Sequence, residues 1–351
     1  MIKVLIIDGS KVIQEFLNNI LSSDPDIQVV GVASSGNEAM ELVKIKKPDL
    51  ITIDLKMDGM DGYETTTRIM ETFPTPIVIV SGIENTKEVV DANRYMEVGA
   101  LAVVFRPAPI DLHQFIAFRK ELIQTVKLMS EIIVVKHFHR KRKELKKSDS
   151  LTQHFENEVK RIQIIAIGAS TGGPLALQTI LSRLPKDLSV PVLIVQHIAP
   201  GFVNVFQKML SSNSGIKLKI AENGEKISAG IGYIAPDNYH MGVTLDRKII
   251  LSNQPPENGS KPSVSFLFRS VAENFGPNSL GVLLTGMGKD GADELKDMKD
   301  KGALTVVQNE ESSVVFGMPG EALRIGASNN ALSPQSIAEI LSKSGSKSIK
   351  T

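Results

Sequence analysis

The segment 164–174 constrains the fold of this chain more than any other, because it reads I-I-A-I-G-A-S-T-G-G-P. Its apolar run is typical of a buried strand, and its proline suits the first turn of a helix. The glycines between them allow a tight turn that residues with a Cβ resist. The segment therefore predicts a strand, a sharp turn and a helix, with Ser170 at the carboxyl end of the strand. Ligands bind at that end of the strands in open parallel sheets.

Three interpretations of the turn at Ser170 remain open. Backbone N–H groups at a helix N-terminus bind anions, although G-A-S-T-G-G matches neither G-x-G-x-x-G nor the P-loop. A purely structural turn with an incidental serine is the second interpretation. The third is a nucleophile on a strand-to-helix turn, which requires a histidine and a carboxylate elsewhere in the chain.

Composition narrows the class of protein. A chain of 351 residues favours two domains, and contents of 42% hydrophobic and 23% charged residues are typical of globular proteins. A net charge of +1 argues against a globally basic nucleic-acid binder, and the lack of cysteine excludes disulfides and thiolate metal sites. No apolar run is long enough for a membrane span or a secretory signal. We therefore expect a cytoplasmic protein that neither binds nucleic acid nor inserts into a membrane.

Residues 1–124 alternate short apolar runs with helical patterns. Strands are expected at 3–7, 27–32, 50–53, 77–80 and 101–105. Five such repeats predict a parallel, doubly wound α/β sheet with helices on both faces. Its carboxyl edge would then bring together Asp8, Asp54 and Ser81.

The motifs at these strand ends, I-I-D, I-D-L-K-M-D-G-M-D-G, V-S-G and F-R-P, resemble those of response-regulator receiver domains, which have a flavodoxin-like strand order. The resemblance implies that Asp54 is the phospho-acceptor and that Ser81 contacts the phosphoryl group. It also implies that Asp8, with Asp54, helps to hold Mg²⁺ and that a histidine kinase is a partner.

Two positions of this receiver site differ from the family pattern. Gly9 stands where the family usually has a second acidic residue, and Arg106 stands where it has a lysine before a proline. Arginine keeps the charge but is a longer, planar donor. These differences leave open whether Mg²⁺ binds and whether Asp54 is phosphorylated. Asp58, close to the site in sequence, could restore some negative charge.

The pattern loosens over residues 125–160, which include the basic run K-H-F-H-R-K-R-K-E-L-K-K. Such a run can bind anionic surfaces, but a solvated linker is the interpretation that we favour. The strand–helix alternation returns over 161–345 and is followed by a tail at 346–351. This second domain predicts a mainly parallel α/β sheet. An antiparallel hairpin is expected among its closely spaced middle strands, which include 232–235, 243–245 and 249–251.

Two histidines of the second domain are candidate bases. His197 follows the apolar run V-L-I-V-Q, and His240 ends the segment Y-I-A-P-D-N-Y-H. Asp290 follows L-L-T-G-M-G-K, a third run that passes from a strand through glycines to a helix. Each residue alone could be an ordinary loop histidine or a helix N-cap. Strand-end loops of one parallel sheet open on the same edge, so contact between Ser170, His197 and Asp290 is expected.

This trio predicts a serine hydrolase. Ser170 would attack an acyl carbon, His197 would carry the proton, and Asp290 would orient the imidazole. The backbone N–H groups of Thr171 and Met287 would hold the oxyanion.

Six motifs of the second domain resemble the protein-glutamate methylesterase (CheB) family: G-A-S-T-G-G-P, Q-H-I-A-P-G-F, Y-I-A-P-D-N-Y-H, K-P-S-V, T-G-M-G-K-D-G-A and S-S-V-V-F-G-M-P. The resemblance implies hydrolysis of glutamate γ-methyl esters on cytoplasmic helices of chemoreceptors with release of methanol. Receptor glutamine deamidation is a second activity that it allows, and it implies no cofactor for the esterase. It also implies a receiver that restrains the active site until it is phosphorylated. Ser265 stands where the family often has an aspartate.

A non-enzymatic signalling scaffold with a phosphorylation-independent receiver is the alternative function. The intact residues Ser170, His197 and Asp290 favour the enzyme.

Overall fold

The computed structural model describes residues 1–57, 59–82, 95, 98–106, 112–131, 158–198, 201 and 203–345. The chain divides into two compact units, Met1–Lys143 and Glu144–Thr351. Each unit has its own sheet and its own hydrophobic core. The whole basic run and the tail 346–351, as well as Asp58, lie outside the described residues.

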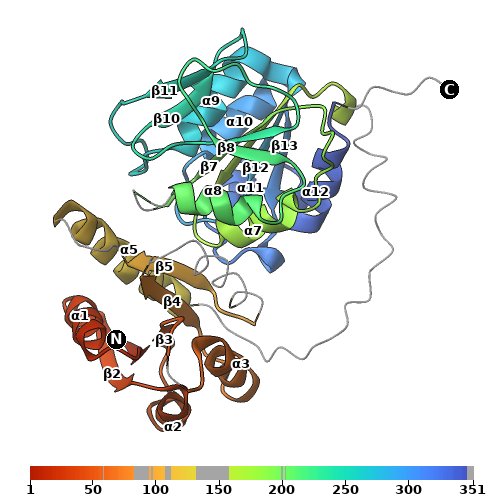
Figure 1. Cartoon of the computed structure of the whole chain (residues 1–351). Coiled ribbons are helices and arrows are strands. Elements are labelled where there is room, and N and C mark those ends of the chain that lie inside the picture. Colours follow the sequence, from red (N-terminus) through yellow and green to blue (C-terminus); the bar gives the residue numbers. More distant parts are fainter. Residues whose placement is uncertain are drawn as a thin grey trace. The chain divides into compact units, whose positions relative to one another are not determined.

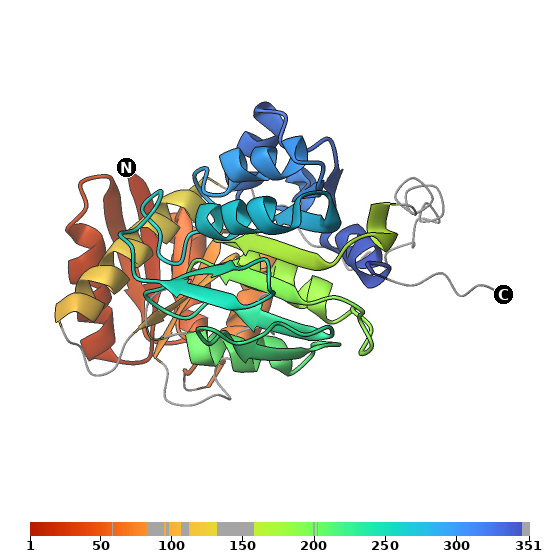
Figure 2. The same cartoon turned by 90° about the horizontal axis from the view of Figure 1, so that it is seen from above.

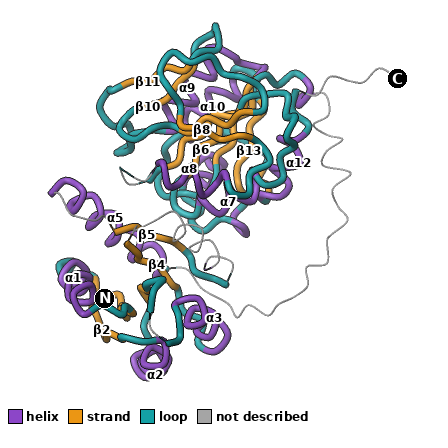
Figure 3. The backbone as a smooth tube through the Cα atoms, viewed as in Figure 1, coloured by secondary structure: helices purple, strands orange, loops and turns teal. Residues whose placement is uncertain are grey.

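The N-terminal unit is built on a parallel sheet of five strands in the order β2-β1-β3-β4-β5, which confirms the expected fold. The strands are β1 (Ile2–Ile7), β2 (Ile27–Ala33), β3 (Leu50–Ile53), β4 (Ile77–Gly82) and β5 (Ala102–Arg106). The described helices are α1 (Lys11–Ser22), α2 (Gly36–Lys46), α3 (Gly62–Thr72) and α5 (Leu112–Ser130). Helices α1 and α5 lie on one side of the sheet and α2 and α3 on the other (Figure 3). Every residue of β3 is buried, as two covered faces require.

Helix α5 extends past residue 124, where we expected the linker to begin. Val126 and Met129 are fully buried, so the apolar face of the helix continues into this region. Lys127 forms ion pairs of 2.8 Å with Asp24 and with Asp26, in the turn between α1 and β2. The last turns of α5 therefore belong to the N-terminal unit.

The same helix carries a buried carboxyl group, that of Glu121, whose burial disfavours its charged form. The Oε2 atom of Glu121 is buried and has no hydrogen-bond partner among the described residues, and burial raises the pKa of Glu121 to about 7. An unfolded chain ionises this group near its ordinary pKa of about 4.3. The unfolded state therefore loses the proton first, and the stability of this unit falls as the pH rises from about 4 to 7.

We expect Glu121→Gln to stabilise the N-terminal unit by on the order of 2 kcal/mol at pH 8 and to have little effect at pH 4. Urea unfolding of the full chain at both pH values, followed by a probe in this unit, measures the difference. Glu41→Gln, at an exposed position of α2, is the matched control and should leave the stability unchanged. Equal stability of Glu121→Gln and wild type at pH 8 would contradict this interpretation.

The C-terminal unit is built on a parallel sheet of seven strands in the order β14-β13-β12-β6-β7-β9-β8. The strands are β6 (Ile164–Ala169), β7 (Val192–Gln196), β8 (Lys217–Ile220), β9 (Ile231–Ile234), β12 (Ser279–Leu283), β13 (Leu304–Gln308) and β14 (Ala331–Leu332). The α-helices are α7 (Gly173–Leu181), α8 (Val203–Ser211), α9 (Val264–Phe275), α10 (Ala292–Asp300), α11 (Met318–Arg324) and α12 (Pro334–Ser342). Helices α9 and α10 cover one face of the sheet, and α7 and α8 cover the other (Figures 1 and 2).

An antiparallel hairpin of β10 (His240–Val243) and β11 (Ile249–Ser252) interrupts the alternation, as expected. Its first strand is nearer the N-terminus than the predicted 243–245. The turn begins at Thr244, whose backbone N–H donates to Lys248, and Leu245 lies in this turn with 74% of its surface exposed. Because Leu245 is apolar, the predicted strand included it, although it lies in the turn.

Among the described residues, no helix is both long enough and apolar enough to cross a membrane.

Candidate active site

Strand register brings Ser170 and His197 side by side. Ala169, the last residue of β6, pairs with Gln196, the last residue of β7. The backbone N–H of His197 donates to the Ala169 carbonyl at 2.9 Å, so the chain leaves both strands at the same level. On the other side of β6, the N–H of Ser170 donates to the carbonyl of Thr285 at 3.0 Å, just past β12. Ser170 therefore lies between two neighbouring strand ends.

Glycines let the chain turn at this point. Gly172 has φ +79°, in the left-handed region, and precedes α7. A Cβ on Gly286 would lie 2.6 Å from the Cβ of Ser170, so the loop after β12 packs directly against the serine only because this residue is glycine. Ser170 is partly exposed, and its hydroxyl makes no hydrogen bond within the described part of the chain. Such a free hydroxyl can meet a substrate.

His197 contacts the predicted carboxylate. Its Nε2 lies 2.8 Å from Oδ2 of Asp290, and the two side chains are 17% and 4% exposed. Burial by itself raises the pKa of Asp290, but the hydrogen bonds from His197 and Ser263 outweigh it and hold the pKa well below its ordinary range. An ionised carboxylate only accepts hydrogen bonds, so Nε2 carries the proton and Nδ1 holds the lone pair. Nδ1 is therefore the nitrogen that can act as a base.

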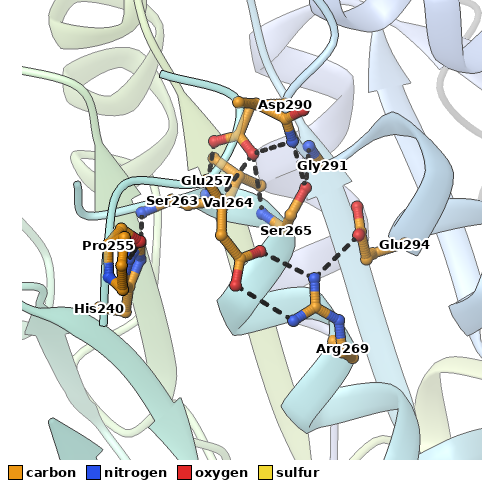
Figure 4. Close-up of polar contacts among 11 residues, drawn as sticks. His240, Pro255, Glu257, Ser263, Val264, Ser265, Arg269, Asp290, Gly291 and Glu294 are labelled. Carbon is orange, nitrogen blue, oxygen red and sulfur yellow. Dashed lines mark hydrogen bonds and ion pairs between the residues drawn. The ribbon is translucent and has the colours of Figure 1, made fainter. Parts of the chain in front are cut away.

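The sequence did not point to the other groups that hold Asp290. Its carboxylate accepts hydrogen bonds from the Ser263 hydroxyl at 2.7 Å, from the Val264 N–H at 2.7 Å and from the Ser265 N–H at 3.2 Å (Figure 4). The Asn258 amide donates a further bond of 3.1 Å. These N–H groups belong to the start of α9, where a negative charge is favoured. The motif K-P-S-V at 261–264 contains two of these donors, Ser263 and Val264, but nothing in it indicated a contact with Asp290.

Ser265, where the family often has an aspartate, has a defined place in the network. Its hydroxyl accepts a hydrogen bond of 3.0 Å from the N–H of Gly291 and one of 3.1 Å from the Asn258 amide. It therefore fastens the residue after Asp290 to α9. An aspartate at this position would place a second negative charge next to Asp290. The neutral serine causes no such repulsion.

His240 is a structural residue. Its side chain is fully buried, and Nε2 lies 3.0 Å from the carbonyl oxygen of Pro255. Nδ1 accepts a hydrogen bond of 3.2 Å from the N–H of Ser263, and the ring stacks on Phe266. Both ring nitrogens are thus occupied, and Figure 4 shows the imidazole against the loop that carries Pro255 and Ser263. His240 positions a hydrogen-bond donor to Asp290 and is not available as the base.

An ion-pair cluster holds the same loop. The guanidinium of Arg269, on α9, lies 2.8 Å from a carboxylate oxygen of Glu257 and 3.1 Å from one of Glu294 on α10 (Figure 4). Two helices and the loop over the site are therefore fastened together. Ser260, in this loop, places its hydroxyl 3.5 Å from Nδ1 of His197.

The two predicted oxyanion donors belong to two loops that contact each other, since Thr171 directly follows Ser170 and accepts a hydrogen bond of 2.9 Å from the Thr285 hydroxyl, and Met287 follows two residues later in the loop after β12. Within the described residues, the backbone N–H groups of Thr171 and Met287 make no hydrogen bond. The turn that contains Met287 is fixed, because the carbonyl of Gly286 accepts from the N–H groups of Gly317 and Met318 at 3.1 and 2.9 Å. That these two free donors form the oxyanion hole remains a prediction.

The residues predicted to form a receiver site, Asp8, Asp54, Ser81 and Arg106, lie at the carboxyl ends of four neighbouring strands, β1, β3, β4 and β5. Burial is the main cause that raises the pKa of Asp8, to about 6, and the charge of Asp54 raises it further. Burial also raises the pKa of Asp54, whereas a hydrogen bond from Ser81 and the charge of Arg106 lower it. A phosphoryl group at Asp54 would therefore meet a hydroxyl and a guanidinium.

The receiver site offers Mg²⁺ two carboxylates. Among the described residues, no cluster of three or more His, Cys, Asp or Glu side chains could hold a metal. Oδ2 of Asp8 is buried and has no hydrogen-bond partner in the described part of the chain, so it is available to a cation. One or two carboxylates together with waters and a phosphate are what Mg²⁺ sites in proteins use. Asp8 and Asp54 therefore fit the ion despite Gly9.

Comparison with known proteins gives consistent matches over both units. Residues 165–341 match the family model of the CheB methylesterase, and residues 4–117 match that of the response regulator receiver domain. The protein-glutamate methylesterase/protein-glutamine glutaminase 1 of Syntrophus aciditrophicus is 49% identical over 344 residues, which cover 98% of each chain. The protein of that description from Nitrosospira multiformis is 47% identical, over 97% of this chain and 96% of its own. The crystal structure of the Thermotoga maritima CheB methylesterase catalytic domain matches with a TM-score of 0.50 and 36% identity, covering 52% of this chain and 98% of that one.

Proposed function

Because this chain belongs to the CheB family of protein-glutamate methylesterases/protein-glutamine glutaminases, we propose that Ser170, His197 and Asp290 hydrolyse the γ-methyl esters of glutamate side chains on the cytoplasmic helices of a chemoreceptor. The observation that carries this proposal is the contact of 2.8 Å between His197 and a buried, ionised Asp290, next to a strand end that presents a free serine hydroxyl.

The first half of the reaction makes an acyl-enzyme. Oγ of Ser170 attacks the γ-carbonyl carbon, and its proton passes to Nδ1 of His197. The negative oxygen of the tetrahedral intermediate accepts hydrogen bonds from the N–H groups of Thr171 and Met287. When the intermediate collapses, the C–O bond to the methoxy group breaks, and Nδ1 returns the proton so that methanol leaves. Asp290 stabilises the imidazolium throughout.

The second half reverses these roles with water. His197 takes a proton from a water molecule, which attacks the ester that links the substrate to Ser170. Collapse of the second intermediate returns the proton to Oγ and releases the glutamate carboxylate. With a glutamine side chain the first leaving group is ammonia instead of methanol, which describes the glutaminase reaction of the family. No metal takes part in either half.

Methanol release from a chemoreceptor that carries methyl-labelled glutamates tests this function. We expect labelled methanol to appear with the full-length protein and free carboxylates to appear at the receptor glutamates. A receptor that keeps all its label would contradict the substrate class. Ammonia release from receptor glutamines, measured in the same samples, tests the second activity separately.

We propose that the receiver unit regulates this reaction through Asp54. When bound, Mg²⁺ would neutralise phosphoryl oxygens, and Asp8 and Asp54 would hold it, with Ser81 and Arg106 donating to the phosphoryl group. We expect the protein to gain the mass of one phosphoryl group when it is incubated with a small phosphodonor and Mg²⁺. Intact mass spectrometry measures this gain. Asp54→Asn is the control that should remain unmodified, and an unchanged mass of the wild type would refute phosphorylation.

Restraint by the receiver is tested by truncation. We expect removal of residues 1–150 to raise kcat/KM for ester hydrolysis by about tenfold, the effect of releasing a blocked state favoured by about 1.4 kcal/mol. Initial rates of methanol release for the full-length and truncated proteins provide the comparison. Equal rates would show that the receiver does not restrain the unphosphorylated enzyme.

A further inference from the structure

Two glutamines end the strands β7 and β13, which flank the neighbouring strands β6 and β12. Gln196 is the last residue of β7 and Gln308 is the last residue of β13, and they are 3% and 1% exposed. In the strand order β13-β12-β6-β7, they enclose the ends of β12 and β6 from both sides. Buried amides need hydrogen-bond partners, so where these two find theirs is informative.

The amide of Gln196 joins the two catalytic segments to each other. Its Nε2 donates to the backbone carbonyl of Ser170 at 2.8 Å and to that of His197 at 2.9 Å. The regular ladder between β6 and β7 stops at Ala169 and Gln196. This side chain therefore continues, past the end of the sheet, the cross-strand bonding that the backbones no longer provide.

The amide of Gln308 supports Ser170 from the opposite side. Its Oε1 accepts a hydrogen bond of 2.9 Å from the N–H of Thr285, and its Nε2 donates to the carbonyl of Ser312 at 2.7 Å. The carbonyl of Thr285 in turn accepts from the N–H of Ser170 at 3.0 Å. Both peptide groups of the nucleophile are thus fixed by a chain of hydrogen bonds that begins and ends on a glutamine.

The orientation of Gln196 does not serve stability alone. Its Oε1 is buried without a partner among the described residues, and leaving an acceptor unpaired costs free energy. A Cβ on Gly173, the first residue of α7, would collide with this oxygen, so this position requires glycine while Gln196 keeps its orientation. An apolar side chain would fill the space without the unpaired oxygen, but it could not hold the two carbonyls.

We propose that Gln196 and Gln308 are positioning residues that set the distance between Oγ of Ser170 and the imidazole of His197; this proposal rests on the function proposed above. Neither amide touches the reacting atoms. A displacement of about 1 Å between a nucleophile and its base reduces the rate steeply. Substrate binding elsewhere on the surface does not depend on that distance. The expected signature is a loss of kcat without a change of KM.

The test compares Gln196→Met and Gln308→Met with wild type in the full-length protein. Methionine keeps the length of the side chain and removes the hydrogen bonds. We expect Gln196→Met to lower kcat for methyl ester hydrolysis by about tenfold or more, with KM within about twofold. Gln308→Met should lower kcat by a smaller factor, again with KM within about twofold. The rate at which a fluorophosphonate labels Ser170 should fall in parallel with kcat.

Gln207→Met is the matched control. Its amide, on α8, also donates to a backbone carbonyl, that of Leu218 at 2.8 Å, but it lies at the far edge of the sheet. It should lose thermal stability without losing kcat. Wild-type kcat in folded Gln196→Met would overturn the proposal, and if that variant does not fold, wild-type kcat in Gln308→Met would overturn it. Equal activity of wild type and Ser170→Ala would instead refute the proposed function.

Discussion

Replacing Ser170 by alanine should lower kcat for methyl ester hydrolysis by about a hundred-thousandfold or more, which is the size of the loss when a serine hydrolase is deprived of its nucleophile. Without Oγ no acyl-enzyme forms, and water must attack the ester directly. The free N–H groups of Thr171 and Met287 would remain, so a small rate above the uncatalysed one should persist. Methanol release under single-turnover conditions measures both rates.

The fold should not change in this variant. The hydroxyl of Ser170 makes no hydrogen bond within the described residues, so its removal leaves no partner unsatisfied. The melting temperatures of Ser170→Ala and wild type should therefore agree. Ser182→Ala, which removes an exposed hydroxyl just after α7, is the matched control and should keep full activity. Substantial hydrolysis by Ser170→Ala would exclude this serine as the nucleophile.

Replacing Asp290 by asparagine should lower kcat by about ten-thousandfold through the tautomer of His197. A carboxylate forces the proton onto Nε2 and leaves Nδ1 as the base. An asparagine can present either its carbonyl or its NH₂ group to Nε2 of His197. When the NH₂ group donates to Nε2, the imidazole proton moves to Nδ1, and Nδ1 can then no longer accept the proton of Ser170. Asp297→Asn, at an exposed position of α10, is the control that should keep wild-type kcat.

Asp290→Asn should also destabilise the C-terminal unit, by about 1–3 kcal/mol at neutral pH, because an amide cannot satisfy all the donors that now meet the carboxylate. The pKa of Asp290 is lowered in the folded protein, so its contribution to stability is present above the unfolded pKa of about 3.9 and is lost as the pH falls below it. The difference in urea stability between wild type and variant should therefore shrink in acid. A wild-type kcat in Asp290→Asn would contradict the assigned role.

The sequence predicted the fold of both units because parallel strands buried on two faces leave continuous apolar runs. It also predicted which residues end the strands, and the register of β6 with β7 and β12 then brings Ser170, His197 and the loop of Asp290 together. The meeting of these residues follows from the strand direction alone, because parallel strands have their carboxyl ends at one edge of the sheet.

Less regular segments gave weaker signals. Helix α11 and strand β14 were not predicted: α11 begins in a run rich in Gly and Pro, and β14 has only two residues. The donors that surround Asp290 come from residues 258–265, where loop and helix start carry no repeating pattern. Gln196 was read only as the end of an apolar run, because a glutamine does not reveal from sequence which carbonyls its amide will meet.

The most direct test of the active site is the reaction of the full-length protein with a fluorophosphonate, followed by peptide mass mapping. This reagent captures a serine hydroxyl only when a neighbouring base activates it. We predict one equivalent of label, located on Ser170, and loss of labelling in His197→Ala. Label on another residue, or an unlabelled protein that still releases methanol from the receptor, would contradict the assignment of Ser170 as the activated nucleophile.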